Sequence, residues 1–199
     1  MSNLADHDAE RSLLLRSAFR VIQRNGYANA QITDILAEAG VGTRAFYRHF
    51  ASKDDVLREL FHENATRSRE MLEQRINAMS DPLGKLLAWI EEMLDLAYTP
   101  RRRDRARLFR SAAAQVAYGD EADLAIRELY APLTAVLREG SATGAFPTCD
   151  PIHDGTIIHA IVWPYFTAAV LEAPLTSKKA AYRNILRFCL PALGVDPSA

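Results

Sequence analysis

Cysteine is scarce in this chain: among 199 residues there are only Cys149 and Cys189, and they form no CxxC pair. Two distant cysteines exclude a disulfide scaffold, and each is expected to serve as a small buried apolar residue in a reducing compartment. Basic residues are not in excess either, since 24 of them face 25 acidic ones. The chain as a whole therefore has no basic field, and any nucleic-acid-binding surface must be local.

Long apolar runs are also missing. The longest, residues 156–171, contains His159 and Pro164 and is shorter than the roughly 20 residues that cross a bilayer. The first ten residues are polar and acidic, without the basic and apolar stretches of a signal peptide. We therefore expect a cytoplasmic protein that has no membrane association.

Apolar residues do recur, and almost everywhere at helical spacing. Examples are Leu15, Ala18, Phe19 and Ile22, then Val56, Leu57, Leu60 and Phe61, then Leu86, Leu87, Ile90, Met93 and Leu94. Turn-forming glycine, proline and asparagine separate these stretches, and no alternating strand pattern competes with them. The sequence predicts an all-α fold of about nine helices.

The first fifty residues fit three short helices, at about residues 12–24, 31–39 and 43–50. Gly40-Val41-Gly42 lies between the second and the third. A three-residue turn with glycine lets two short helices cross steeply without a Cβ clash. This arrangement is typical of a helix-turn-helix.

The third of these helices has two distinct faces. Phe46 and Phe50 stand four residues apart and are predicted to point inward. The opposite face carries Thr43, Arg44, Tyr47 and Arg48. Arginine can bind guanine through two hydrogen bonds, threonine can contact a thymine methyl group, and a tyrosine hydroxyl can bind phosphate. The face therefore has the chemistry of a major-groove reader.

Local charge agrees with this interpretation. Residues 11–53 contain seven basic and two acidic side chains, although the whole chain carries a net charge of −1. This asymmetry predicts a cationic DNA-binding head on an acidic body. A helical hairpin with a solvated cationic face would explain the charge, but not the glycine turn or the exposed aromatic residue.

These residues resemble the N-terminal domain of the TetR-type bacterial repressors. The matching segments are Asn25-Gly26-Tyr27, Ile32-Thr33-Asp34-Ile35, residues 39–50 (AGVGTRAFYRHF) and residues 52–57 (SKDDVL), about a quarter of the chain. The chain departs from the family pattern at Gly42, where a serine is usual, and at Leu36 and Ala30.

The resemblance implies a set of DNA contacts: Gln31, Thr33, Thr43, Arg44, Ala45, Tyr47, Arg48, His49 and Lys53. Tyr47 and Lys53 would bind phosphate. It also implies a DNA-binding domain over residues 1–53 and a helical effector-binding and dimerisation domain over residues 54–199. Two C-terminal helices, at about residues 151–171 and 177–193, would form a four-helix interface in a homodimer. The implied function is that of a repressor released from near-palindromic double-stranded operator DNA by a small-molecule effector.

The effector pocket is expected to be largely apolar, with no other cofactor and no metal. Its candidate residues are Trp89, Met93, Phe109, Tyr130, His159, Trp163 and Phe166. Plain core packing is the alternative for each of them. Pro164 interrupts the hydrogen bonding of its predicted helix beside Trp163, where a kink could admit a ligand.

An enzyme is the main competing function, but the candidate catalytic groups are poor. His62-Glu63 is followed by Thr66 where a zinc-protease helix requires a second histidine, and Asp150, His153 and Asp154 lie at a helix start, where acids cap the helix. No phosphate-binding glycine loop and no GxSxG motif are present. A protein-binding helical module would leave Arg44, Tyr47 and Lys53 without a role. We therefore expect no catalytic residues.

Overall fold

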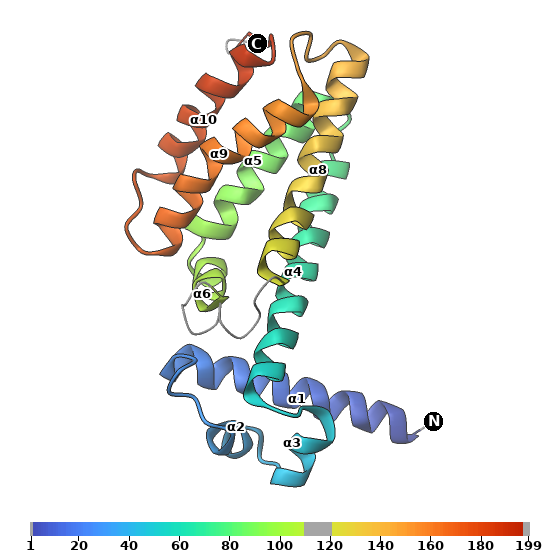
Figure 1. The fold of residues 1–199 in the computed structure, drawn as a ribbon, viewed down its shortest axis with the longest axis vertical. Helices are drawn as coiled ribbons and strands as arrows, with labels where there is room; N and C mark the ends of the chain where they lie inside the picture. The colour runs from blue at the N-terminus through green and yellow to red at the C-terminus, as the bar shows by residue number, and fades with distance from the viewer. Residues whose placement is uncertain (1, 110–120, 197–199) are drawn as a thin grey trace. The chain divides into compact units, whose positions relative to one another are not determined.

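The computed structural model describes residues 2–109 and 121–196, and it describes the side chains of residues 6–108 and 129–196. The helices are α1 (Ser2–Asn25), α2 (Ile32–Ala39), α3 (Thr43–His49), α4 (Lys53–Asn77), α5 (Pro82–Tyr98), α6 (Pro100–Phe109), α8 (Glu121–Thr143), α9 (Pro151–Val170) and α10 (Lys178–Ala192) (Figure 1). These described ranges hold nine helices and no strand, which confirms the predicted all-α fold. Among the helices in these described ranges, none is long and apolar enough to span a bilayer.

The chain divides into two compact units, and the division falls within α4. One unit contains the residues up to Thr66, and the other contains Arg67–Arg107 together with the residues from Asp123 onward. The predicted functional boundary after residue 53 coincides with the start of α4 rather than with this division. It stays a prediction.

In the first unit, α1 packs against α2 and α3 (Figure 1). The apolar residues at helical spacing close its core: Leu14, Leu15, Ala18, Val21, Ile22, Ile35, Phe46, Phe50, Val56 and Leu57 are all buried. The prediction of α1 was wrong at its N-terminal end, because the helix begins at Ser2, about ten residues before the first apolar repeat. The polar turns before Ser12 carry no apolar signal, and periodicity alone could not find them.

The connection between α2 and α3 depends on one glycine. Gly40 adopts a left-handed conformation with φ of 68°, and its N–H donates to the Leu36 carbonyl at the end of α2. Val41 N–H donates to the same oxygen at 3.2 Å. A residue with a Cβ is strained in this conformation. Gly40 therefore ends α2 and turns the chain into α3.

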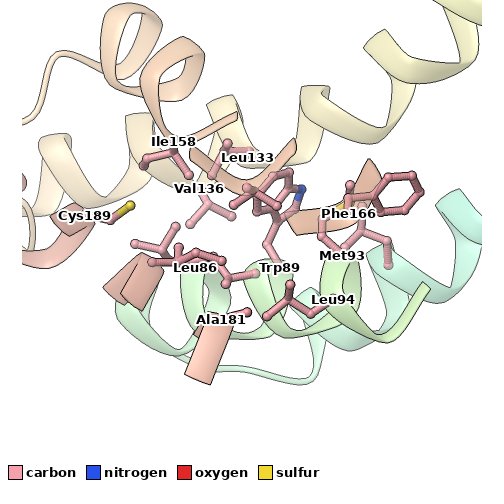
Figure 2. Close-up of a cluster of buried hydrophobic side chains, with 14 of the residues drawn as sticks. Leu86, Trp89, Met93, Leu94, Leu133, Val136, Ile158, Phe166, Ala181 and Cys189 are labelled. Atoms are coloured by element: carbon pink, nitrogen blue, oxygen red, sulfur yellow. The ribbon is translucent and has the colours of Figure 1, made fainter. Parts of the chain in front are cut away.

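In the second unit, α5, α9 and α10 pack against one another (Figure 1). Trp89 lies at the centre of their core, surrounded by Met93, Leu133 and Phe166 (Figure 2). Side-chain caps fix the helix starts: Asp81 accepts a hydrogen bond from Gly84 N–H at 2.9 Å, and Ser177 accepts one from Ala180 N–H at 3.3 Å. Capping of this kind contributes about 1 kcal/mol to each helix.

The second unit also contains a charged cluster that surrounds one buried carboxylate and links four helices. The Glu92 side chain on α5 is 2% exposed and binds the guanidinium groups of Arg75 on α4, at 2.6 Å, and Arg102 on α6. Arg75 also binds Asp95 at 2.7 Å, and Lys178 on α10 binds Asp95 as well. A buried carboxylate needs such partners, because an unpaired buried charge is strongly destabilising. The cluster therefore ties α4, α6 and α10 to α5.

Candidate functional site

The helix α3 is anchored by one face and exposed on the other. Phe46 is fully buried and Phe50 is 5% exposed, as their spacing predicted. Their rings lie 5.8 Å apart, and the guanidinium of Arg11 on α1 lies 5.7 Å from the centre of the Phe50 ring. These contacts fix α3 by its inward side.

The opposite face of α3 presents Thr43, Arg44, Tyr47 and Arg48 to solvent. Tyr47 is 57% exposed, which is unusual for a large aromatic side chain. Within the described residues, Arg44 forms no ion pair, so its guanidinium is available to an outside acceptor. The structure thus brings together, on one surface, the side chains that the helical spacing predicted.

The start of α2 adds two polar side chains to the same unit. Gln31, the residue before α2, and Thr33 in its first turn are both exposed. The Asp34 carboxylate accepts a hydrogen bond from the Gln31 N–H at 3.2 Å, which secures this first turn. The α2 N-terminus thereby presents polar groups of the kind that contact phosphate.

Lys53, predicted to bind phosphate, is engaged within the chain. Its ammonium donates hydrogen bonds to the carbonyl oxygens of Tyr27, at 2.8 Å, and Ala30, at 2.9 Å. It also lies 4.4 Å from the centre of the Tyr27 ring. The Tyr27 hydroxyl in turn donates to Asp54, and burial together with this bond raises the pKa of Tyr27. Lys53 therefore ties the start of α4 to the segment before α2.

Two other predicted DNA contacts are less accessible than the outward face. Ala45 is 8% exposed. The His49 side chain is fully buried, and its Nε2 lies 2.7 Å from the Glu10 carboxylate on α1. The same carboxylate lies 3.3 Å from the Arg48 guanidinium. Glu10 was not predicted as a site residue, although His7, Glu10 and buried Leu14 share one face of α1 at helical spacing.

Most of the cationic residues of this unit have acidic partners. Arg20 binds Glu38 at 2.7 Å, and Arg24 binds the same carboxylate at 3.4 Å. These hydrogen bonds, with Arg20 contributing most, lower the pKa of Glu38. Arg11 binds Glu59 at 2.6 Å. The predicted positive charge is therefore partly compensated, which leaves Arg44 as the least compensated cation of α3.

In the second unit, most of the predicted pocket residues lie in contact with one another. Ring centroids are 5.7 Å apart for Trp89 and Tyr130, 3.8 Å for Tyr130 and His159, and 5.6 Å for His159 and Trp163. The Trp163 and Phe166 rings stack at 5.0 Å. Met93 is fully buried in the same core (Figure 2). Phe109 ends α6, and its side chain lies outside the described part of the chain.

The contacting rings of Trp89, Tyr130, His159, Trp163 and Phe166 form an aromatic row. Two polar atoms in this row have no hydrogen-bond partner among the described residues: the Tyr130 hydroxyl and His159 Nε2. The Trp89 indole, in contrast, donates to the Leu129 carbonyl at 3.0 Å. Burial lowers the pKa of His159 and raises the pKa of Tyr130, so both side chains are neutral near pH 7. Unpaired buried polar atoms are costly, so these two atoms are candidate hydrogen-bonding positions for a bound molecule.

A groove of about 390 Å³ lies elsewhere in the second unit. Its walls come from α4, α5 and α8, and they include Arg69, Glu73, Lys85, Pro132 and Glu139. Lys85 is already bound to Glu139 at 2.7 Å. Of the predicted pocket residues whose side chains the structure describes, none lines this groove. Its charged walls were not identifiable from the sequence, because they join side chains of α4 and α5 to those of α8, which is distant in the chain.

The chain matches a known family over part of its length and known structures over most of it. Residues 14–60 match the family described as "Bacterial regulatory proteins, tetR family". The "Fatty acid metabolism regulator protein" of Bacillus subtilis (strain 168) is 31% identical over 83 residues, which are 42% of this chain and 43% of that relative. The aligned part thus spans less than half of this curated relative.

Solved structures extend the likeness beyond the helix-turn-helix. The crystal structure of the transcriptional regulator FadR from Bacillus subtilis in complex with stearoyl-CoA has a TM-score of 0.71 at 21% identity, and the match covers 91% of this chain and 98% of that one. A TetR transcription regulator from Haloarcula marismortui has a TM-score of 0.78 at 21% identity, covering 92% and 97%. At these identities the likeness establishes the fold.

Both findings point to regulators rather than to enzymes. The family match includes α2, α3 and most of the core of the first unit, and the structural likeness continues through the helices of the second. Residues 14–60 therefore match the helix-turn-helix part of the tetR family, and the chain as a whole has the fold of the regulators to which it is similar.

Proposed function

We propose that this protein is a cytoplasmic transcriptional repressor that binds operator DNA through α3 and is released by a small-molecule effector. The observation that carries the DNA-binding part is the exposed face of Thr43, Arg44, Tyr47 and Arg48 on a helix whose other face is buried. A helix of this kind fits the major groove, where arginine reads guanine and a tyrosine hydroxyl binds phosphate.

A symmetric dimer would present two copies of α3 to successive major grooves, about 34 Å apart. This geometry requires a near-palindromic operator. Exposed apolar side chains on α9 and α10 support such a dimer: Ile152, Ile157 and Phe188 are each more than half exposed. Apolar side chains in such positions commonly mark a protein interface.

The aromatic row of the second unit supports an effector that is largely apolar and carries a hydrogen-bonding group. Tyr130 can donate a hydrogen bond, and neutral His159 can either donate or accept one. An effector that binds one conformer of the dimer more tightly would change DNA affinity by the ratio of its two affinities. Stearoyl-CoA is the first compound to test, because FadR of the same fold binds it.

The DNA-binding part is tested with Arg44→Ala and Tyr47→Phe, measured against a promoter fragment from the protein's own gene region over a range of salt concentrations. Arg44→Ala should weaken binding by about 1–3 kcal/mol, and Tyr47→Phe should weaken it by loss of a phosphate contact. Arg101→Ala removes an equal charge from an exposed site on α6 and serves as the control. Unchanged binding in both α3 variants would refute the role of this surface in DNA binding.

The effector part is tested by titrating stearoyl-CoA into the protein–operator complex while tryptophan emission is recorded. Both tryptophans of the chain, Trp89 and Trp163, belong to the aromatic row, so occupancy there should change the emission. Tyr130→Phe should reduce the response without altering DNA affinity in the absence of ligand. If neither stearoyl-CoA nor a screen of other apolar compounds changes operator affinity, the protein binds DNA constitutively.

A further inference from the structure

The N-terminal turns of α1 hold one carboxylate against the last turn of α3. The Glu10 carboxylate lies 2.7 Å from His49 Nε2 and 3.3 Å from the Arg48 guanidinium. The His7 ring, one turn earlier on α1, lies 4.1 Å from the His49 ring. Figure 1 shows α1 passing beside α3. A single acidic residue outside the helix-turn-helix therefore contacts two neighbouring residues of α3.

These two contacts differ in kind. The His49 side chain is fully buried, so its bond to Glu10 fixes the position of the α3 C-terminus. The Arg48 side chain is 56% exposed and belongs to the outward face with Arg44 and Tyr47. An exposed ion pair of this type is weak, commonly below about 1 kcal/mol, so a phosphate can compete for the arginine. Glu10 thus fixes the position of His49 and holds the Arg48 guanidinium near α1.

From this geometry we propose that Glu10 is a positioning residue that holds DNA affinity below what α3 alone would give. The proposal rests on the proposed DNA-binding function. The Glu10 charge draws the Arg48 guanidinium toward α1, and it also repels phosphate that approaches the same turn. Binding to DNA must then exchange the Glu10–Arg48 ion pair for an Arg48–phosphate or Arg48–base contact.

A purely structural role for Glu10 makes a different prediction. If Glu10 only supports His49, a neutral side chain that still accepts a hydrogen bond should leave DNA binding unchanged. Glu10→Gln provides this side chain, because the amide oxygen can accept a bond from His49 but carries no charge to hold Arg48. The two interpretations are therefore separable in one variant.

The experiment compares the wild type with Glu10→Gln, Arg48→Gln and the double variant, using the full chain and the same promoter fragment. Glu63→Gln is the charge-matched control, since Glu63 is an exposed residue of α4 in the same unit and contacts no α3 cation within the described residues. Glu10→Gln should bind DNA roughly two- to fivefold more tightly than Glu63→Gln.

The double variant decides whether Arg48 carries the effect. In the Arg48→Gln background, Glu10→Gln should give no gain beyond that of the charge control, since no arginine remains to be released. Equal affinities of Glu10→Gln and Glu63→Gln would overturn the proposal, as would a gain that persists without Arg48. Absence of salt-dependent binding by the wild type would refute the proposed function itself, which is a separate outcome.

Discussion

At the scale of single residues, His159 is a histidine held neutral by burial. Its ring lies against Tyr130, at 3.8 Å between centroids, and its Nε2 has no partner among the described residues. Burial lowers its pKa, because the imidazolium would lose its hydration. As the pH falls through the ordinary histidine pKa of about 6.5, the unfolded chain therefore binds protons more readily than the folded protein. The free energy of unfolding decreases in that range.

Replacing His159 with phenylalanine should remove this acid sensitivity. The melting temperature of the wild type should fall relative to that of His159→Phe as the pH is lowered from about 7.5 to about 5.5, the range that brackets the ordinary histidine pKa. The exposed His153 has the opposite tendency, because its bond to Asp150 raises its pKa, and it is retained in both proteins. Parallel melting curves across this range would mean that burial of His159 has no energetic consequence.

Which side chains face outward was predictable, but their partners were not. The faces of α3 follow from helical periodicity alone, and the structure exposes Arg44 and Tyr47 as predicted. Periodicity gives no information on contacts made across the chain. The two carbonyls that bind Lys53 and the Glu10 carboxylate that binds His49 come from segments 23 to 39 residues away. These contacts belong to tertiary packing and required the structure.

At the scale of elements, the turn before α3 contains two glycines, of which one has a backbone conformation that favours glycine and the other does not. Gly40 has φ of 68°, whereas Gly42 precedes α3 with φ of −86°, and a Cβ at Gly42 would meet no heavy atom within 4 Å. Gly42 caps α3 without any side-chain hydrogen bond. Only Gly40 is therefore required by backbone conformation, while Gly42 is a site where a serine could add a cap.

Substitutions at the two glycines should have opposite signs. Gly40→Ala should destabilise the protein by about 1 kcal/mol, because alanine is strained in the left-handed region. Gly42→Ser should stabilise it by roughly 0.5 kcal/mol, because the hydroxyl can accept an N–H of the first turn and the unfolded chain loses freedom. Urea unfolding measures both effects. Equal destabilisation by both substitutions would show that the turn does not adopt this geometry.

Element boundaries were predictable where a chemical signal marks them. Ser52 stands directly before α4, and its hydroxyl accepts a hydrogen bond from Asp55 N–H at 3.1 Å, as a capping serine does. Ser177 was predicted to start a helix and caps α10. The N-terminal turns of α1 have no such marker, so their helicity, and with it the position of Glu10, was not found from the sequence.

At the scale of the whole molecule, α9 and α10 would have two roles: packing within the second unit and forming the interface of the proposed dimer. Their inward faces are buried around Ile158, Val162 and Ile185, whereas Ile157 and Phe188 remain more than half exposed. Isolated exposed apolar residues are ordinary on protein surfaces. Several on two adjacent helices are better explained by a second copy of the chain, which would cover about 800 Å² on each partner in an interface of standard size.

Phe188→Asp should convert the dimer into a folded monomer, because the carboxylate would be desolvated without a partner at the interface. Sedimentation at micromolar protein measures the change in mass. Binding to a near-palindromic operator should weaken by about 100-fold. In a dimer the two α3 helices bind both half-sites as one unit, and a monomer loses this gain in affinity. Met71→Asp makes the same change at an exposed apolar residue of α4 and should keep the dimer intact. If Phe188→Asp stays dimeric, the two chains associate through a surface other than α9 and α10.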